Sequence, residues 1–151
     1  MRGMVLGGLI LALFVVAGSF VDGGDKKNPG TAELKKLQGT WKFLSQEFEG
    51  KARPAEDVAK LKITFTGDKW SVTEDGKEVQ AGTHTLDPSK KPAQLDAKIT
   101  EGHDKGNTMI GIYEMKGDTL TVIFDLKGKD RPTEFKSKAG QMLAVIQKLK
   151  K

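Results

Sequence analysis

The chain has 151 residues, a length typical of one domain, and it contains no cysteine. The lack of cysteine excludes a disulfide framework and a lipid-modified lipoprotein, so the mature domain must rest on its apolar core. The formal net charge is +5, with lysines interspersed among acidic residues and only three arginines, Arg2, Arg53 and Arg131. Nucleic-acid-binding proteins usually concentrate Lys and Arg in a stripe, so we predict no nucleic-acid partner.

The N-terminal segment has the three parts of a secretory signal. Residues 1–3 are a short basic start, residues 4–17 are mostly apolar, and Ala17-Gly18-Ser19 supplies small residues for cleavage. The alternative is an uncleaved membrane anchor, but the apolar run is shorter than the about 20 residues of a spanning helix. We therefore predict a cleaved signal peptide at 1–19, a secreted or periplasmic (cell-envelope) location, and no membrane span after cleavage.

The rest of the chain is expected to be a tether followed by one β domain. Residues 20–31 have too few apolar side chains to pack and are interpreted as a flexible tether, which leaves 32–151 as the domain. Thr31 can cap a short helix over 32–37, and Pro54 predicts a second short helix over 53–59. Hydrophobic patterning predicts strands over 39–49, 61–66, 70–73, 77–86, 93–100, 108–115, 119–126 and 142–149.

Eight short strands at regular spacing, with turn residues in almost every gap, are typical of an antiparallel barrel or sandwich. Asp75-Gly76 is a strong signal for a two-residue hairpin. Closure into a barrel removes the exposed edges that an exported sheet without disulfides would otherwise present. The predicted fold class is therefore all-β, an eight-stranded antiparallel β-barrel with a short N-terminal helix.

The interior of this barrel supplies the candidate binding residues. Eight strands enclose a space that side chains can just fill or that holds one small ligand, and both alternatives remain open. Trp41 is interpreted as a plug that holds the N-terminal helix onto the first strand, although it could instead contact a ligand at the mouth. The candidate ligand-binding residues are Phe43, Trp70, Ala81, Thr83, Ile110, Ile112, Val122 and Phe124.

Gly39-Thr40-Trp41, at the head of the first strand, resembles the Gly-x-Trp signature of lipocalins. The other motifs that point the same way are Leu37-Gln38-Gly39-Thr40-Trp41, Phe65-Thr66-Gly67-Asp68, Leu86-Asp87-Pro88-Ser89-Lys90-Lys91-Pro92, Gly111-Ile112-Tyr113-Glu114, Gly117-Asp118-Thr119-Leu120 and Arg131-Pro132-Thr133-Glu134-Phe135. In this order they resemble an uncharacterised lipocalin-like domain family abundant in planctomycete bacteria, over about residues 34–149. The resemblance implies a barrel and export more than any activity.

Two departures separate the chain from classical lipocalins. It lacks their disulfides, and it has no arginine near its end to lie over the tryptophan. Lys148 or Lys150 would have to take that place through a cation–π contact. Gly39 and Trp41 are expected to be structural rather than ligand-binding residues.

No catalytic constellation is recognisable in the sequence. It contains no Gly-x-Ser-x-Gly, no cysteine nucleophile, and no glycine-rich phosphate or dinucleotide motif. His84 and His103 are the only histidines, and His103 with Glu101, Asp104 and Asp87 offers too weak a ligand set for a zinc site, which needs three or four convergent ligands. We therefore expect no enzyme activity, no metal and no cofactor.

Two functions remain open on these grounds. The first is an exported barrel that binds a small apolar or amphipathic ligand without catalysis. The alternative is a structural or protein-interaction module of the cell envelope with a filled barrel. We expect a monomer, and the interior volume should separate the two functions, because a void above a few hundred Å³ favours a binding protein.

Overall fold

The computed structural model of the protein describes residues 29–150. The predicted signal peptide at 1–19 and most of the predicted tether at 20–31 lie outside the described residues. The first described element is helix α2 (Pro29–Leu37), which begins before the predicted helix over 32–37 and takes in the end of the predicted tether. Within residues 29–150, no helix combines the length and the apolar character needed to cross a membrane.

Strands make up most of the described chain, and all eight predicted strands are present. A two-residue strand, β2, adds to them after the first turn. The strands are β1 (Gly39–Phe48), β2 (Lys51–Ala52), β3 (Leu61–Thr66), β4 (Lys69–Glu74), β5 (Lys77–Asp87), β6 (Ala93–Gly102), β7 (Thr108–Lys116), β8 (Thr119–Asp125) and β9 (Gln141–Lys148).

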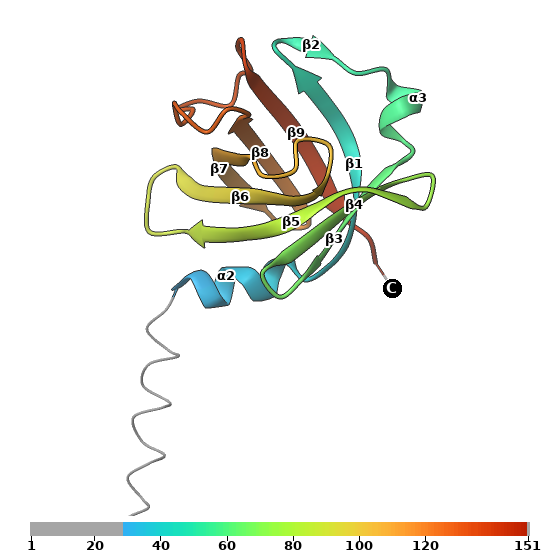
Figure 1. The fold of residues 1–151 in the computed structure, drawn as a ribbon. Coiled ribbons are helices and arrows are strands. Elements are labelled where there is room, and N and C mark those ends of the chain that lie inside the picture. Colours follow the sequence, from blue (N-terminus) through green and yellow to red (C-terminus); the bar gives the residue numbers. More distant parts are fainter. Residues whose placement is uncertain (1–28, 151) are drawn as a thin grey trace, which may run out of the picture.

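The sheet closes on itself. Its strand order is β2-β1-β3-β4-β5-β6-β7-β8-β9, and β1 pairs in addition with β9. This antiparallel pairing runs from Trp41 opposite Lys148 to Phe48 opposite Met142, and Figure 1 shows β1 beside β9. Closure leaves only the short β2 at an edge, so the predicted all-β, eight-stranded antiparallel barrel is confirmed.

The two helices of the described residues, α2 and α3, lie at opposite ends of the barrel (Figure 1). Helix α3 (Ala55–Val58) follows β2 and is shorter than the predicted helix over 53–59. Pro54 precedes α3 with a φ of −55°, the value that suits a helix N-terminus. Helix α2 leads directly into β1, so its C-terminal end must lie at the end of the barrel where β1 begins.

A long connection between β8 and β9 lies against the outside of the barrel. Asp125 begins it, and its Oδ2 accepts a 2.8 Å hydrogen bond from the Lys129 N–H. Arg131 Nη1 then donates to Asp96 Oδ1 at 2.8 Å and to the Gly111 carbonyl at 2.9 Å. Because Asp96 points away from the interior, these bonds hold the connection on the outer surface of β6 and β7.

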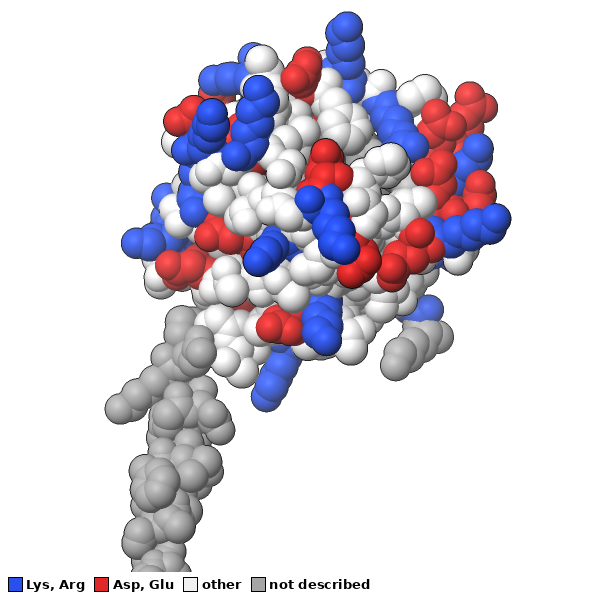
Figure 2. Space-filling model, in the orientation of Figure 1, with Lys and Arg blue, Asp and Glu red and all other residues white. Residues whose placement is uncertain are grey.

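Charged side chains are mixed on the surface. Figure 2 shows basic and acidic residues interspersed over the face in view, with no separate basic stripe there. The ion pair between Lys138 and Glu134, at 3.1 Å, has both side chains more than half exposed. Such exposed pairs contribute about 0–1 kcal/mol, so the stability of the domain must come from its interior.

Candidate ligand-binding site

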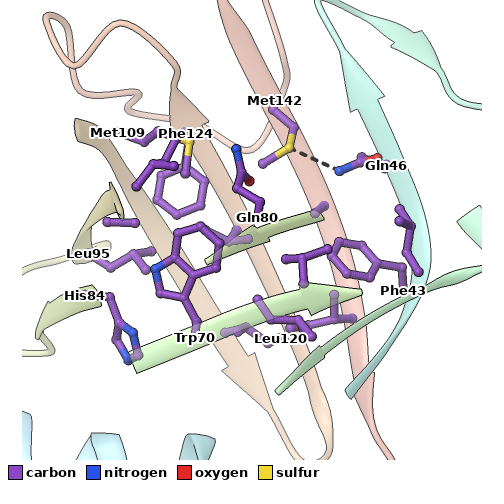
Figure 3. A pocket seen from close by; sticks show the side chains of 18 of the residues that line it. Phe43, Gln46, Trp70, Gln80, His84, Leu95, Met109, Leu120, Phe124 and Met142 are labelled. Carbon is purple, nitrogen blue, oxygen red and sulfur yellow. Dashed lines mark hydrogen bonds between the residues drawn. The ribbon is translucent and has the colours of Figure 1, made fainter. Parts of the chain in front are cut away.

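The barrel encloses a cavity of about 440 Å³. Every strand of the closed barrel contributes side chains to its wall, and most of these are aliphatic or aromatic. Figure 3 shows Phe43, Trp70, Leu120 and Phe124 around this space. The volume arises because eight tilted strands enclose more room than the side chains pointing inward occupy.

Trp41 closes the end of the barrel next to α2. Its side chain is 1% exposed, and its Nε1–H donates a 2.8 Å hydrogen bond to the Leu37 carbonyl. Gly39 joins α2 to β1 with a φ of 115°, a conformation that other residues rarely adopt. Lys148 Nζ, and not Lys150, lies 5.8 Å from the centroid of the indole. The structure thus places Gly39 and Trp41 where the plug interpretation expects them.

Further side chains fasten α2 and the residue after it to this end. Gln38 Oε1 accepts a 2.7 Å hydrogen bond from the Gly67 N–H in the β3–β4 turn. Tyr113, on β7, donates its hydroxyl to Glu33 Oε1 at 2.9 Å. Burial, and then the Glu33 carboxylate, raise the pKa of Tyr113 well above 10.0, so the hydroxyl stays a donor to α2.

The opposite end of the cavity is polar and reaches solvent. Arg53 Nη1 donates to Gln46 Oε1 at 3.0 Å, and Arg53 Nη2 lies 3.7 Å from Glu74 Oε1. Gln46 Nε2 in turn donates to Met142 Sδ at 3.3 Å, the dashed line in Figure 3. Phe48 lines this end and is 40% exposed. These residues form the mouth of the cavity.

His84 lies deep in the cavity, near the closed end. Its backbone N–H donates to the carbonyl of Asp68 in the β3–β4 turn at 2.9 Å. Its ring meets the ring of Phe65 at an edge, with 5.4 Å between centroids, and Phe65 meets Trp41 in the same way at 6.2 Å. Figure 3 shows the imidazole well away from Gln46 at the mouth.

The His84 side chain is buried and unpaired. It is 3% exposed, and neither ring nitrogen has a hydrogen-bond partner among residues 29–150. Burial lowers the pKa of His84 below 6.5, and the opposing effect of the Asp68 charge is smaller. At neutral pH the imidazole therefore carries one donor and one acceptor. Leaving a buried polar group unpaired costs about 1–3 kcal/mol, and packing alone does not account for that cost.

We expect the protein to lose stability through His84 as the pH falls below 6.5. Below pH 6.5 the unfolded chain binds a proton at His84 that the folded protein does not bind, so the free energy of unfolding decreases as the pH decreases. Above 6.5 the contribution of His84 to the free energy of unfolding is fully present. Urea unfolding at pH about 7.5 and about 5.5 measures the loss. His84→Leu should lose less stability than wild type between these two pH values, and the control Thr85→Val, at the exposed neighbour of His84, should lose as much as wild type. Equal losses in all three proteins would contradict this role of His84.

The predicted ligand-binding residues divide into two groups. Four line the cavity: Phe43, Trp70, Val122 and Phe124. Four are not part of the cavity wall: Ala81, Thr83, Ile110 and Ile112. That any of the eight contacts a ligand stays a prediction.

A bulge in β5 explains why Ala81 and Thr83 lie elsewhere. Strict alternation along β5 would put Val79, Ala81 and Thr83 on one face. The pairing of β5 with β4, however, shifts register between Val72 and Thr73, because Val79 is an extra residue on β5. One extra residue turns every later side chain to the other face of a strand. Val79 therefore lines the cavity near the mouth, and His84 lines it near the base.

The expectation that Ile110 and Ile112 face inward was wrong. Met109 and Tyr113 line the cavity, so alternation along β7 points the two isoleucines outward. Ile112 is nevertheless only 1% exposed. It pairs with the fully buried Ile123 of β8, on the outer surface near the β8–β9 connection.

Sequence reasoning missed His84 as a cavity residue. The stretch Thr83-His84-Thr85-Leu86 contains the pattern that would have found it. Leu86 is the apolar residue of this stretch and is expected to face inward, and His84, two residues earlier, shares its strand face. Counting inward positions backward from Leu86, rather than forward from Val79, would have placed the imidazole in the interior. Leu86 and His84 both line the cavity.

The fold and the site define a closed antiparallel β-barrel with an apolar cavity that opens at one end. Within residues 29–150, no three His, Cys, Asp or Glu side chains are grouped so that they could hold a metal ion. Comparison of the chain with protein-family models, with curated proteins and with solved structures finds no significant match.

Proposed function

We propose that the protein is an exported, lipocalin-like barrel that binds a small apolar or amphipathic ligand in its cavity without chemical conversion. The observation that carries the proposal is the cavity of about 440 Å³, with mainly apolar walls and a polar mouth. Small-molecule sites have volumes of about 300–1,000 Å³ and the same combination of apolar walls with few polar groups.

The lipocalin-like relationship and the export are parts of the same proposal. The barrel, the plug formed by Trp41, the turn at Gly39 and the lysine over the indole support the relationship. The sequence over 1–19 supports export. Binding without catalysis is favoured because His84, a buried titratable group that faces the cavity, has no hydrogen-bonded acid or nucleophile among the described residues.

The rival function, a cell-envelope module with a filled barrel, would need side chains to occupy the interior. The size of the cavity favours the binding function over this rival. Native mass spectrometry of the protein purified from its own cells should detect a bound small molecule. Recovery of the protein only in complex with another protein, with an empty barrel, would support the module instead.

Filling part of the cavity should weaken binding. Ala97 lines the cavity and is 3% exposed, so Ala97→Phe would place a ring in the ligand's space. We expect affinity for the neutral fluorescent probe N-phenyl-1-naphthylamine to fall by about tenfold or more, because overpacking costs about 1–3 kcal/mol. Fluorescence titration of the purified domain measures the change.

The matched control is Ala81→Phe, on the neighbouring strand. Ala81 is not part of the cavity wall, so the same added ring there should leave probe affinity within about twofold of wild type. Circular dichroism of each purified variant checks that it keeps the fold. Equal affinity of wild type and a folded Ala97→Phe would exclude binding inside the barrel.

A further inference from the structure

We infer that the ligand carries one neutral hydrogen-bonding group, such as a hydroxyl, which binds His84 at the closed end while its apolar part extends toward the mouth. The inference rests on the proposed ligand-binding function and specifies the class of ligand. Its basis is the juxtaposition of an apolar cavity with a single imidazole that is buried, faces that cavity and lacks a partner among residues 29–150.

The base of the cavity provides few other polar groups. The Tyr113 hydroxyl also belongs to this end, but it is engaged by Glu33 of α2. The Trp70 indole donates its N–H to the Thr83 carbonyl at 3.1 Å. His84 therefore remains the group at the base that can both donate and accept a hydrogen bond. A ligand hydroxyl has the same pair of functions, so it can satisfy one ring nitrogen as donor or the other as acceptor.

The charges around His84 favour a neutral head group over an anionic one. Asp68 is the charged group that acts on His84, and its charge is negative. Among the described cavity residues the one Lys or Arg side chain is Arg53, which is at the mouth and paired with Gln46 and Glu74. A carboxylate at the base would meet the negative charge of Asp68, and no Lys or Arg side chain belongs to the described cavity wall at that end. An ammonium group would lose its hydration to face a single neutral acceptor.

The arrangement of the walls sets the direction of the ligand. Between His84 and the mouth the wall is formed by apolar side chains such as Ile99, Val122 and Phe124. An alkyl chain placed along this wall removes apolar surface from water. The reverse orientation would put the chain against the imidazole and leave both ring nitrogens without partners, whereas the head-first orientation gives one of them a hydrogen bond.

Competition against N-phenyl-1-naphthylamine tests this inference with four probes of one chain length: octanol, octane, octanoate and octylammonium. Octanol should bind most tightly to wild type. His84→Leu should weaken octanol binding by about tenfold, the value of one buried hydrogen bond, and should leave octane within about twofold. His84→Gln, which keeps a donor and an acceptor, should recover part of the octanol affinity. The matched control is Thr85→Val, which removes a hydrogen-bonding group from the exposed neighbour of His84 outside the cavity wall, and it should change none of the four.

A second measurement does not depend on any variant. His84 and His103 are the only histidines, so the imidazole ¹⁵N resonances of the wild-type protein are few and can be assigned. Octanol should shift the His84 ring nitrogens far more than those of His103, which lies near the mouth. Octane, which has no hydrogen-bonding group, should not produce the large shift at His84.

The possible outcomes separate this inference from the proposed function. Tighter binding of octanoate or octylammonium than of octanol would overturn the neutral head group. Equal binding of octanol and octane with unmoved His84 nitrogens would overturn the role of His84 while leaving the binding function intact. No displacement of the fluorescent probe by any of the four, or no binding of that probe, would count against the binding function itself.

Discussion

Replacing Trp41 by alanine is expected to lower the free energy of unfolding by about 3–5 kcal/mol. The indole is 1% exposed, it packs edge-on against Phe65, and its N–H bonds the Leu37 carbonyl. The substitution removes a large buried side chain and leaves that carbonyl without its partner, at the junction that holds α2 onto the barrel. Urea denaturation followed by circular dichroism measures the loss.

Two controls separate the parts of this effect. Trp41→Phe keeps an aromatic ring but has no N–H, so it should lie between wild type and Trp41→Ala. Leu44→Ala, on the same strand at a side chain that is 47% exposed, should change stability by about 0.5 kcal/mol or less. A loss for Trp41→Ala no greater than that of Leu44→Ala would contradict the role of Trp41 as the plug of the barrel.

Adding a single methyl group at Gly82 is the second change with a large expected effect. A Cβ at this position would overlap the Lys98 carbonyl oxygen and lie 2.8 Å from Trp70 Cζ2. Trp70 can lie across the wall of the cavity because Gly82, its pairing partner on β5, has no side chain. We expect Gly82→Ala to cost about 1–3 kcal/mol of stability and to displace the indole, which is observable as a shift in tryptophan fluorescence.

The control for Gly82→Ala is Ser71→Thr, which adds one methyl group to β4. Ser71 lies between Trp70 and Val72, which both line the cavity, so its own side chain points outward. Its stability should stay within about 0.5 kcal/mol of wild type, with unchanged tryptophan fluorescence. A Gly82→Ala protein as stable as wild type would show that the backbone of β5 can move to accommodate the methyl group. The position of Trp70 in the cavity wall would then not depend on the absence of a side chain at Gly82.

Local sequence patterns were sufficient to predict the strands but not always their faces. In β3, strict alternation sets Leu61, Ile63 and Phe65 on one face, and all three residues line the cavity. In β5 the same reasoning failed beyond Val79, because the bulge at that residue depends on how β5 pairs with β4. In β7 the residues Ile110 and Ile112 were more apolar than their neighbours, but their face is on the outer surface of the barrel.

The sequence by itself determined the eight strands of the barrel, their antiparallel order and the position of Trp41 at the start of the first of them. These follow from alternation, from turn residues such as Asp75-Gly76, and from Gly39 before Trp41, all of which act over a few neighbouring residues. Only the tertiary structure decided that β1 pairs with β9, that about 440 Å³ remains unfilled, and that His84 faces this space. These properties depend on register and on the summed volumes of side chains far apart in the chain, which no local pattern encodes.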